Sequence, residues 1–231
     1  MKRLAIIPAR GGSKRIPRKN IKSFLGKPIL SYSIEAAIDS GLFDKVIVST
    51  DDTEIAEVGK RFGAKVPFLR SKHNADDYAT TFDVIKEVIF EFGNIGETFD
   101  EACCIYPSAP FVTKKMLTDF YNFFKESNFD CVFPALRYSY PIQRALKIDT
   151  DGKMSMFNPE HIETRSQDLE FSYHDAGQFY WFNVQKLLNY GKLWTENTGV
   201  KVITEMQAQD IDTIEDWEIA EFKYKFNQKL K

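Results

Sequence analysis

Short apolar runs alternate with helix-like segments as far as Arg137, and this order limits the possible folds more than any other feature of the chain. The run "RLAIIPA" near the amino end is continuously apolar, as in a strand that is covered on both faces. It is followed by "PILSYSIEAAIDSG", where Pro28 suits a first helical turn and Gly41 suits a helix end. The same order recurs in "KVIVST" and "DDTEIAEVGKRFG". Such alternation predicts an α/β fold with a mostly parallel sheet and helices on both faces.

Two further strand and helix pairs extend the pattern. "AKVPF" is expected to be a strand before a helix over about 77–92, and "EACCIY" is expected to be a strand before a helix over about 114–125. "DCVFPAL" is the next expected strand. Ligands of such sheets bind beyond the carboxyl ends of the strands, so the loop after the first strand is a candidate site.

The pattern changes after Arg137, where the chain becomes polar, turn-rich and aromatic up to about residue 178. Within this stretch, "DTDG" predicts a tight hairpin turn. "QFYWF" and "VKVITEM" then return as strands, and a helix from about Ile214 closes the chain. We therefore expect one domain over 1–231, with an inserted subdomain over about 137–178.

Composition excludes several classes of protein. The chain has 231 residues, 43% of them hydrophobic, which is enough for one substantial core. Its 31 basic and 33 acidic residues give a net charge of −2, so no general attraction to nucleic acid or to a membrane surface is expected. No apolar stretch approaches the roughly 20 residues of a membrane span, and no cleavage signal is seen, so we expect a cytoplasmic protein. Cys103, Cys104 and Cys131 are expected to be reduced core thiols.

A basic loop, "ARGGSKRIPRKN", follows the first expected strand. A P-loop would need a Gly-Lys-Ser/Thr triplet, and a dinucleotide fingerprint would need a third glycine at the position of Arg15, so the loop matches neither. Gly11 and Gly12 permit backbone N–H groups to approach an anion. Arginine forks and mobile lysines beside them suit a polyphosphate. The sequence predicts a phosphate-binding loop, and the alternative is a solvated basic turn. Its cations are Arg10, Lys14, Arg15, Arg18 and Lys19.

Longer motifs give a family resemblance that runs along the whole chain. "IPARGGSKRIPRKNIKSFLGKPIL" resembles the signature of the acylneuraminate-type cytidylyltransferases, which make CMP-linked nine-carbon sugar acids, and "VSTDD", "ADDYATT" and "QDIDT" follow at the expected places. Within this family, "YPIQRAL", "RSQDL" and "YHDAGQFY" are most similar to the pseudaminic acid branch. Sialic acid enzymes usually have "LQPTSPLR" where this chain has "IYPSAPFV", and an arginine where it has His174. These departures argue against sialic acid as the substrate.

The resemblance implies an activity. Members of the family join the anomeric hydroxyl of the sugar acid to the α-phosphorus of CTP and expel pyrophosphate, with Mg²⁺ bound between phosphates and protein. The implied fold is a Rossmann-like nucleotidyltransferase, and the implied partners are CTP, the acid sugar and a second copy of the chain. The inserted segment would form the homodimer interface and send basic side chains into the neighbouring cleft.

The resemblance also assigns roles to particular positions. The implied catalytic residues are Arg10, Lys19 and Asp212. The implied nucleotide-binding residues are Ala9, Arg10, Gly11, Gly12, Ser13, Lys14, Lys19, Asn20, Arg70, Thr80 and Thr81. The candidate sugar-binding residues are Tyr106, Gln143, Arg144, Arg165, His174 and Gln178. For Thr80 and Thr81 the alternative is an ordinary place in a first helical turn, and for His174 it is a buried, hydrogen-bonded ring.

Asp210 and Asp212 are the candidate ligands of the metal. In an extended segment, residues two apart face the same side, so both carboxylates are expected to point together while Ile211 turns into the core. Mg²⁺ needs hard oxygen ligands, and one or two carboxylates with substrate phosphates suffice. The alternative for Asp212 is to cap the following helix.

Several rival functions share some of these features. The closest rivals are cytidylyltransferases for legionaminic acid, sialic acid or Kdo. Only the residues of the inserted segment distinguish them from a pseudaminic acid enzyme. A glycosyltransferase can also use an Asp-x-Asp metal motif, but it has less need of a triphosphate-sized basic loop. A module that binds CTP without reacting is the third class, and the pairing of leaving-group cations with metal-type carboxylates argues against it.

Overall fold

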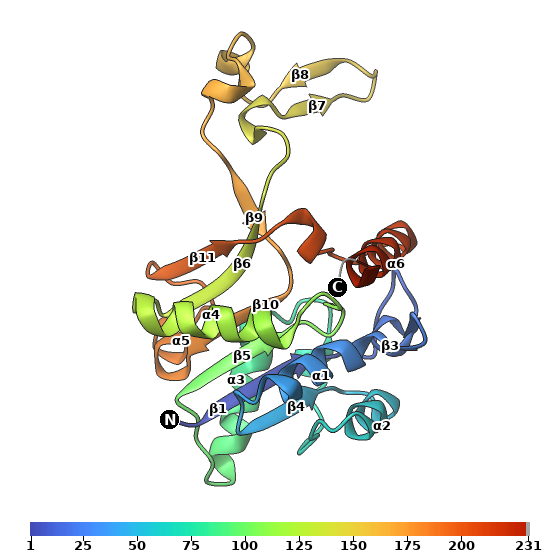
Figure 1. The fold of residues 1–231 in the computed structure, drawn as a ribbon, viewed down its shortest axis with the longest axis vertical. Coiled ribbons are helices and arrows are strands. Elements are labelled where there is room, and N and C mark those ends of the chain that lie inside the picture. The colour runs from blue at the N-terminus through green and yellow to red at the C-terminus, as the bar shows by residue number, and fades with distance from the viewer. Residues whose placement is uncertain (230–231) are drawn as a thin grey trace.

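The computed structural model describes residues 1–229 and contains one seven-stranded sheet (Figure 1). The strand order is β11-β6-β10-β5-β1-β4, and β9 pairs with β6 beside this path. The strands are β1 (Arg3–Pro8), β4 (Lys45–Ser49), β5 (Glu101–Ile105), β6 (Cys131–Arg137), β9 (Tyr173–Asp175), β10 (Phe179–Asn183) and β11 (Thr198–Val202). Strands β9 and β10 run antiparallel to their neighbours, and the other five share one direction. The expected mostly parallel sheet is confirmed.

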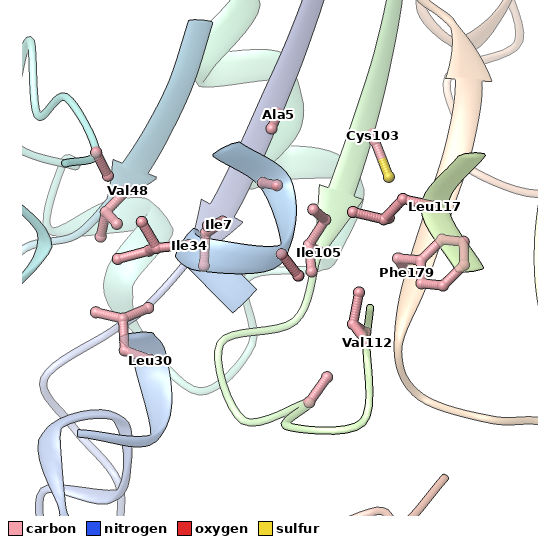
Figure 2. Close-up of a cluster of buried hydrophobic side chains, with 14 of the residues drawn as sticks. Ala5, Ile7, Leu30, Ile34, Val48, Cys103, Ile105, Val112, Leu117 and Phe179 are labelled. Atoms are coloured by element: carbon pink, nitrogen blue, oxygen red, sulfur yellow. The ribbon is translucent and has the colours of Figure 1, made fainter. Parts of the chain in front are cut away.

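Helices cover both faces of this sheet. They are α1 (Ile29–Ser40), α2 (Thr53–Arg61), α3 (Thr81–Asn94), α4 (Lys114–Ser127) and α5 (Val184–Tyr190), whereas α6 (Ile214–Lys229) packs against the region between β1 and α1. Neighbouring residues of β1 point to opposite faces, as the period of a strand requires. Ala5 and Ile7 pack in one cluster with apolar side chains of α1, α2 and α4, which Figure 2 shows in close-up. Leu4 and Ile6 pack in a second cluster with α3 and α5.

One expected strand is absent. "AKVPF" forms no strand, and only Lys65 pairs with β4, through a single bridge to Ile47. Val48 donates to the Lys65 carbonyl at 2.9 Å, and Lys65 donates to Val46 at 2.8 Å. Pro67 has no N–H with which to continue this ladder, so the pairing stops after one residue.

The segment after Arg137 leaves the sheet as an arm, which we define as residues 138–172 (Figure 1). It carries the hairpin of β7 (Leu146–Ile148) and β8 (Met154–Met156), so the turn expected at "DTDG" is present. The chain returns as β9, where Tyr173 lies opposite Arg137 on β6. Within residues 1–229, no helix has the length and apolar content to cross a bilayer.

The amino-terminal loop is held against the last helix by a small core of its own. After β1 the chain forms the turn of β2 (Ser23–Phe24) and β3 (Lys27–Pro28) before α1. Ile16 and Phe24 from this region pack with Ile211, Trp217 and Ala220. All five are at most 5% exposed. This apolar cluster brings the basic loop to the segment just before α6.

Candidate active site

A cavity of about 520 Å³ lies where β1 and β5 end, at the edge of the sheet that the strand order predicts. The cavity is lined by side chains from the basic loop, from residues 70–84, from the segment after β5 and from the segment just before α6. Ten of the sequence-predicted site residues are among them: Arg10, Ser13, Lys14, Lys19, Asn20, Arg70, Thr80, Thr81, Tyr106 and Asp212.

The basic loop and the acidic segment meet in this cavity although they are almost 200 positions apart. Arg15 Nη2 lies 2.7 Å from Asp212 Oδ1. Lys19 Nζ donates to the Ile211 carbonyl at 2.6 Å and lies 3.8 Å from Asp212 Oδ1. Burial lowers the pKa of Lys19, and the Asp212 carboxylate acts in the opposite direction. A cation and a carboxylate are therefore fixed on the same wall.

Asp212 does not cap the helix that follows it. Thr213 Oγ1 accepts from the Asp216 backbone N–H at 3.2 Å, and Asp216 Oδ2 accepts from the backbone of both Asp212 and Thr213. These reciprocal hydrogen bonds provide acceptors for the free backbone N–H groups at the start of α6. The Asp212 side chain is thus left to the cavity, which removes the capping alternative.

Asp210 and Asp212 stand on either side of Ile211, whose side chain is fully buried as expected. Asp212 lines the cavity, whereas Asp210 does not. Partial desolvation and repulsion from the Asp212 carboxylate raise the pKa of Asp210. The charge of Lys19 opposes this repulsion, and two neighbouring carboxylates offer the hard oxygen ligands that a divalent cation prefers. Among residues 1–229 no group of three or more metal-ligating side chains occurs, so this pair needs phosphate oxygens or water to complete a coordination sphere.

The two glycines of the basic loop do not face this cavity. Gly11 donates its N–H to Asp51 Oδ1 at 3.0 Å, and a Cβ at Gly11 would lie 2.8 Å from Asp52 Oδ2. Gly11 and Gly12 instead line an adjoining cavity of about 480 Å³. Ala9 is fully buried and also lies outside the first cavity. Gly11 therefore permits a close approach to Asp51 and Asp52 just before α2, whereas a Cβ at Gly12 would meet no atom within 4 Å.

An acidic residue that sequence reasoning missed holds two of the cations. Arg10 Nη1 lies 2.9 Å from Asp77 Oδ1 and donates to the Asp76 carbonyl at 2.8 Å. Lys14 pairs with the same Asp77 carboxylate, and this hydrogen bond lowers the pKa of Asp77. Asn20 is buried and donates to the Arg10 carbonyl at 2.9 Å, which fixes the backbone of the loop. The two adjacent acids in "ADDYATT" were the available signal for this contact.

Residues between 70 and 81 form another part of the cavity wall. Arg70 is only 7% exposed and bonds Ser49 through its Nε atom at 3.1 Å, and burial lowers its pKa. Thr80 is the N-cap of α3, in a capping box with Asp83. Thr81 is free of that role, and its Oγ1 lies 3.2 Å from the hydroxyl of Tyr106. Thr81 and Tyr106, which the sequence assigned to nucleotide and sugar respectively, are therefore neighbours.

Of the six candidate sugar-binding residues, only Tyr106 lines the cavity. Gln178 is buried, and its amide nitrogen donates to the Gln207 carbonyl at 2.6 Å. His174 lies on β9, with Nδ1 2.9 Å from the Asp175 carbonyl and its ring beside Tyr138.

The remaining three candidates, Gln143, Arg144 and Arg165, lie on the arm. Gln143 donates to the Glu170 carbonyl at 3.0 Å, and Arg165 pairs with Asp168 at 2.7 Å. None of the three lines the cavity of its own chain.

Solved structures match the fold of this chain. A CMP:2-keto-3-deoxy-manno-octonic acid synthetase, solved in complex with CTP, matches with a TM-score of 0.71 over 99% of this chain and 100% of that chain, at 17% identity. The 4-diphosphocytidyl-2C-methyl-D-erythritol synthase of Anaerococcus prevotii matches with a TM-score of 0.63 over 97% of this chain and 98% of that chain, at 15% identity. The fold is that of the Rossmann-like nucleotidyltransferases.

Sequence comparison then gives the family. The family model described as cytidylyltransferase matches residues 4–212. The pseudaminic acid cytidylyltransferase of Campylobacter jejuni is 44% identical over 229 residues, 99% of each chain. The CMP-N,N'-diacetyllegionaminic acid synthase of Legionella pneumophila is 30% identical, again over 99% of each chain. This chain belongs to the cytidylyltransferase family.

Proposed function

We propose that this protein transfers CMP from CTP to the anomeric hydroxyl of pseudaminic acid and releases pyrophosphate. The main support for the proposal is that the basic loop and the acidic segment line the same cavity, where Lys19 and Arg15 lie beside Asp212. The choice of pseudaminic acid rests on 44% identity to the Campylobacter jejuni enzyme along the whole chain. A legionaminic acid substrate is an alternative, supported by 30% identity to the Legionella pneumophila synthase along the whole chain.

The cations of the loop suit the charge movement of this reaction. Attack on the α-phosphorus moves negative charge onto the leaving pyrophosphate, and fixed cations stabilise that charge more in the transition state than in the ground state. Lys19 is held by the Ile211 carbonyl and is only 20% exposed, so its charge is already in place. Arg10 and Lys14 would exchange Asp77 for phosphate oxygens.

Asp210 and Asp212 are the proposed metal-binding residues. Mg²⁺, when bound there, would neutralise phosphate charge and orient the triphosphate. Asp212 has a second task that involves no metal, because it also restrains Arg15 and Lys19 on the cavity wall.

We further propose that the protein is a homodimer and that the arm forms the dimer interface. Several apolar residues of the hairpin are strongly exposed: Leu146 at 55%, Ile148 at 74%, Met154 at 61% and Phe157 at 61%. Arg144 and Arg165 lie outside their own cavity, and in a dimer they would contribute to the partner's sugar site. Because CTP is an intracellular metabolite, we place the enzyme in the cytoplasm. Light scattering of the wild type and of an Ile148→Glu variant tests the dimer.

Pyrophosphate release with CTP and a panel of acid sugars tests the substrate. Pseudaminic acid is expected to give the highest kcat/KM. If legionaminic acid, sialic acid or Kdo is turned over faster, that sugar replaces pseudaminic acid as the proposed substrate. Hydrolysis of a UDP-sugar without turnover of CTP would favour a glycosyltransferase. Tight CTP binding without any turnover would favour a binding module.

Two variants test the assigned catalytic residues. Arg10→Ala and Asp212→Asn are expected to reduce kcat by about 10²–10³-fold, since each removes a group that acts on developing charge. Both residues are at the cavity and outside the core clusters, so the thermal midpoint should stay within a few degrees. Arg61→Ala, on the exposed end of α2, is the matched control and should retain full activity. Activity retained in Asp212→Asn would contradict the proposal.

A further inference from the structure

A row of hydroxyl groups runs from the cavity into the protein and ends at a carboxylate. Thr81 Oγ1 lies 3.2 Å from the Tyr106 hydroxyl, which lies 3.5 Å from the hydroxyl of Tyr180. Tyr180 in turn hydrogen-bonds Asp175 Oδ2. Tyr180 is only 3% exposed, and its ring packs edge-to-face against Tyr106 with centroids 5.6 Å apart. We call these four residues the hydroxyl row.

Counting protons gives the row a direction. An ionised carboxylate only accepts hydrogen bonds, so Tyr180 must donate its single proton to Asp175. The Tyr180 oxygen can then act only as an acceptor toward Tyr106, and the Tyr106 oxygen likewise toward Thr81. The negative charge at the buried end favours this same order, because aligned hydrogen bonds polarise one another. Asp175 Oδ1 is itself fixed by the Gly177 N–H at 2.9 Å.

We propose that Asp175 and Tyr180 are positioning residues that make the cavity end of this row an acceptor of hydrogen bonds. With their protons committed inward, Tyr106 and Thr81 turn only lone pairs toward the ligand. The row would therefore select a ligand group that carries N–H and disfavour one that presents a carbonyl oxygen at the same place. This inference rests on the proposed use of a cytidine nucleotide and an acylamino sugar.

Two parts of the proposed substrates offer such an N–H group. Cytosine carries an exocyclic amine where uracil carries a carbonyl oxygen, and acylamino substituents of the acid sugar carry amide N–H groups. Both share the chemistry that the row recognises. The experiment separates them by changing one ligand at a time.

The experiment compares Tyr180→Phe with Tyr121→Phe. Tyr180→Phe keeps the ring but breaks the row, so Tyr106 can turn its proton toward the ligand. Tyr121 is a matched control, because its hydroxyl also bonds a carboxylate, Glu101 Oε2 at 3.1 Å, and it does not line the cavity. Calorimetry measures CTP and UTP binding without sugar, and steady-state kinetics measure KM for acid sugars with and without acylamino groups.

A cytosine contact predicts that Tyr180→Phe lowers the preference for CTP over UTP by roughly two- to tenfold, the range of one hydrogen bond. A sugar contact predicts the same factor as a rise in KM for the acylated sugar alone, with kcat unchanged. Either result supports the inference. If Tyr180→Phe changes neither quantity more than Tyr121→Phe does, the inference is wrong.

Two further measurements exclude a general loss of structure. Asp175→Asn leaves an acceptor for Tyr180 but removes the charge, so it should shift the same ratio in the same direction and by less. In a Tyr106→Phe background, Tyr180→Phe should no longer change the CTP preference or the KM for the acylated sugar. If the free-energy effects of the two substitutions simply add, the inference is wrong. A wild type that binds CTP over UTP but releases no pyrophosphate with any acid sugar would refute the proposed function alone.

Discussion

Replacing Asp52 by asparagine would test the ion pair that fixes the glycine turn of the basic loop. Asp52 Oδ1 caps α2 by accepting from the Ile55 N–H at 3.0 Å, and Arg18 donates to the two carboxylate oxygens at 2.5 and 3.0 Å. The hydrogen bonds from Arg18 lower the pKa of Asp52 from 3.8 to about 2. The Asp52 side chain is 22% exposed and abuts Gly11, so the pair links the stability of the fold to the shape of the loop.

The lowered pKa gives the size and the sign of the effect. A shift of about 1.8 corresponds to about 2.4 kcal/mol, and solvent around the partly exposed Arg18 reduces this to about 1–2 kcal/mol. Because the folded state binds this proton less tightly than the unfolded state, the contribution is fully present above about pH 5. It falls to about half near pH 3 and vanishes near about pH 1. The asparagine side chain keeps the capping oxygen but carries no charge.

Urea unfolding at several pH values between 3 and 7 measures this difference. Wild type should exceed Asp52→Asn in free energy of unfolding by about 1–2 kcal/mol at pH 7, and the gap should narrow as the pH falls from 4 to 3. Asp39→Asn, at an exposed position of α1, serves as the control and should show no such gap. A gap that does not change with pH would refute the assignment of the stability to the charge of Asp52.

Three further predictions concern other parts of the fold. Gly199→Ala should lower the free energy of unfolding by about 1–3 kcal/mol, as urea titration can check, because the new Cβ would lie well inside van der Waals contact of the Phe129 ring. Asp77→Asn should tighten CTP binding in calorimetry, since two loop cations would no longer be held by a carboxylate; weaker binding would contradict this. Lys125→Met should cost about 1–3 kcal/mol of stability, because the Glu101 carboxylate, only 2% exposed, loses the cation that Lys125 supplies. A loss below about 0.5 kcal/mol would speak against that role.

The sheet could be predicted because it follows from local patterns, and the meeting of the two charged segments was expected from the roles that the family resemblance implies for them. Apolar runs between helix-like segments define parallel strands, and parallel strands place their following loops at one edge. The basic loop after β1 was therefore expected at the site. The spacing of Asp210 and Asp212 around Ile211 correctly predicted which side chain enters the core.

Contacts between loops could not be predicted in the same way. Asp77 was missed because its pairing with Arg10 and Lys14 depends on how two irregular segments fold over each other. The N–H of Gly11 was expected to meet an anionic ligand, and the structure gives it to Asp51. A side chain that lies beside a turn in space competes with any ligand for the donors of that turn, and sequence spacing contains no information on that competition.

The prediction of a strand at "AKVPF" was wrong for a different reason. Its composition is that of a strand, but strand composition does not guarantee a continuous ladder when a proline stands within the run. The hydroxyl row combines both difficulties, since Tyr180 reads as an ordinary core residue in "FYWF" and its partner Asp175 is on another strand.

The paired departure and return of the chain at Arg137 and Tyr173 has a consequence for how this architecture can vary. Because the two ends of the arm are neighbours across an antiparallel pair, the intervening residues can be shortened, lengthened or exchanged without altering the threading of the core. The arm is therefore a segment that can be exchanged independently of the sheet. Swapping it between relatives named for different sugars would change this segment while the sheet and the cavity at its edge stay as they are.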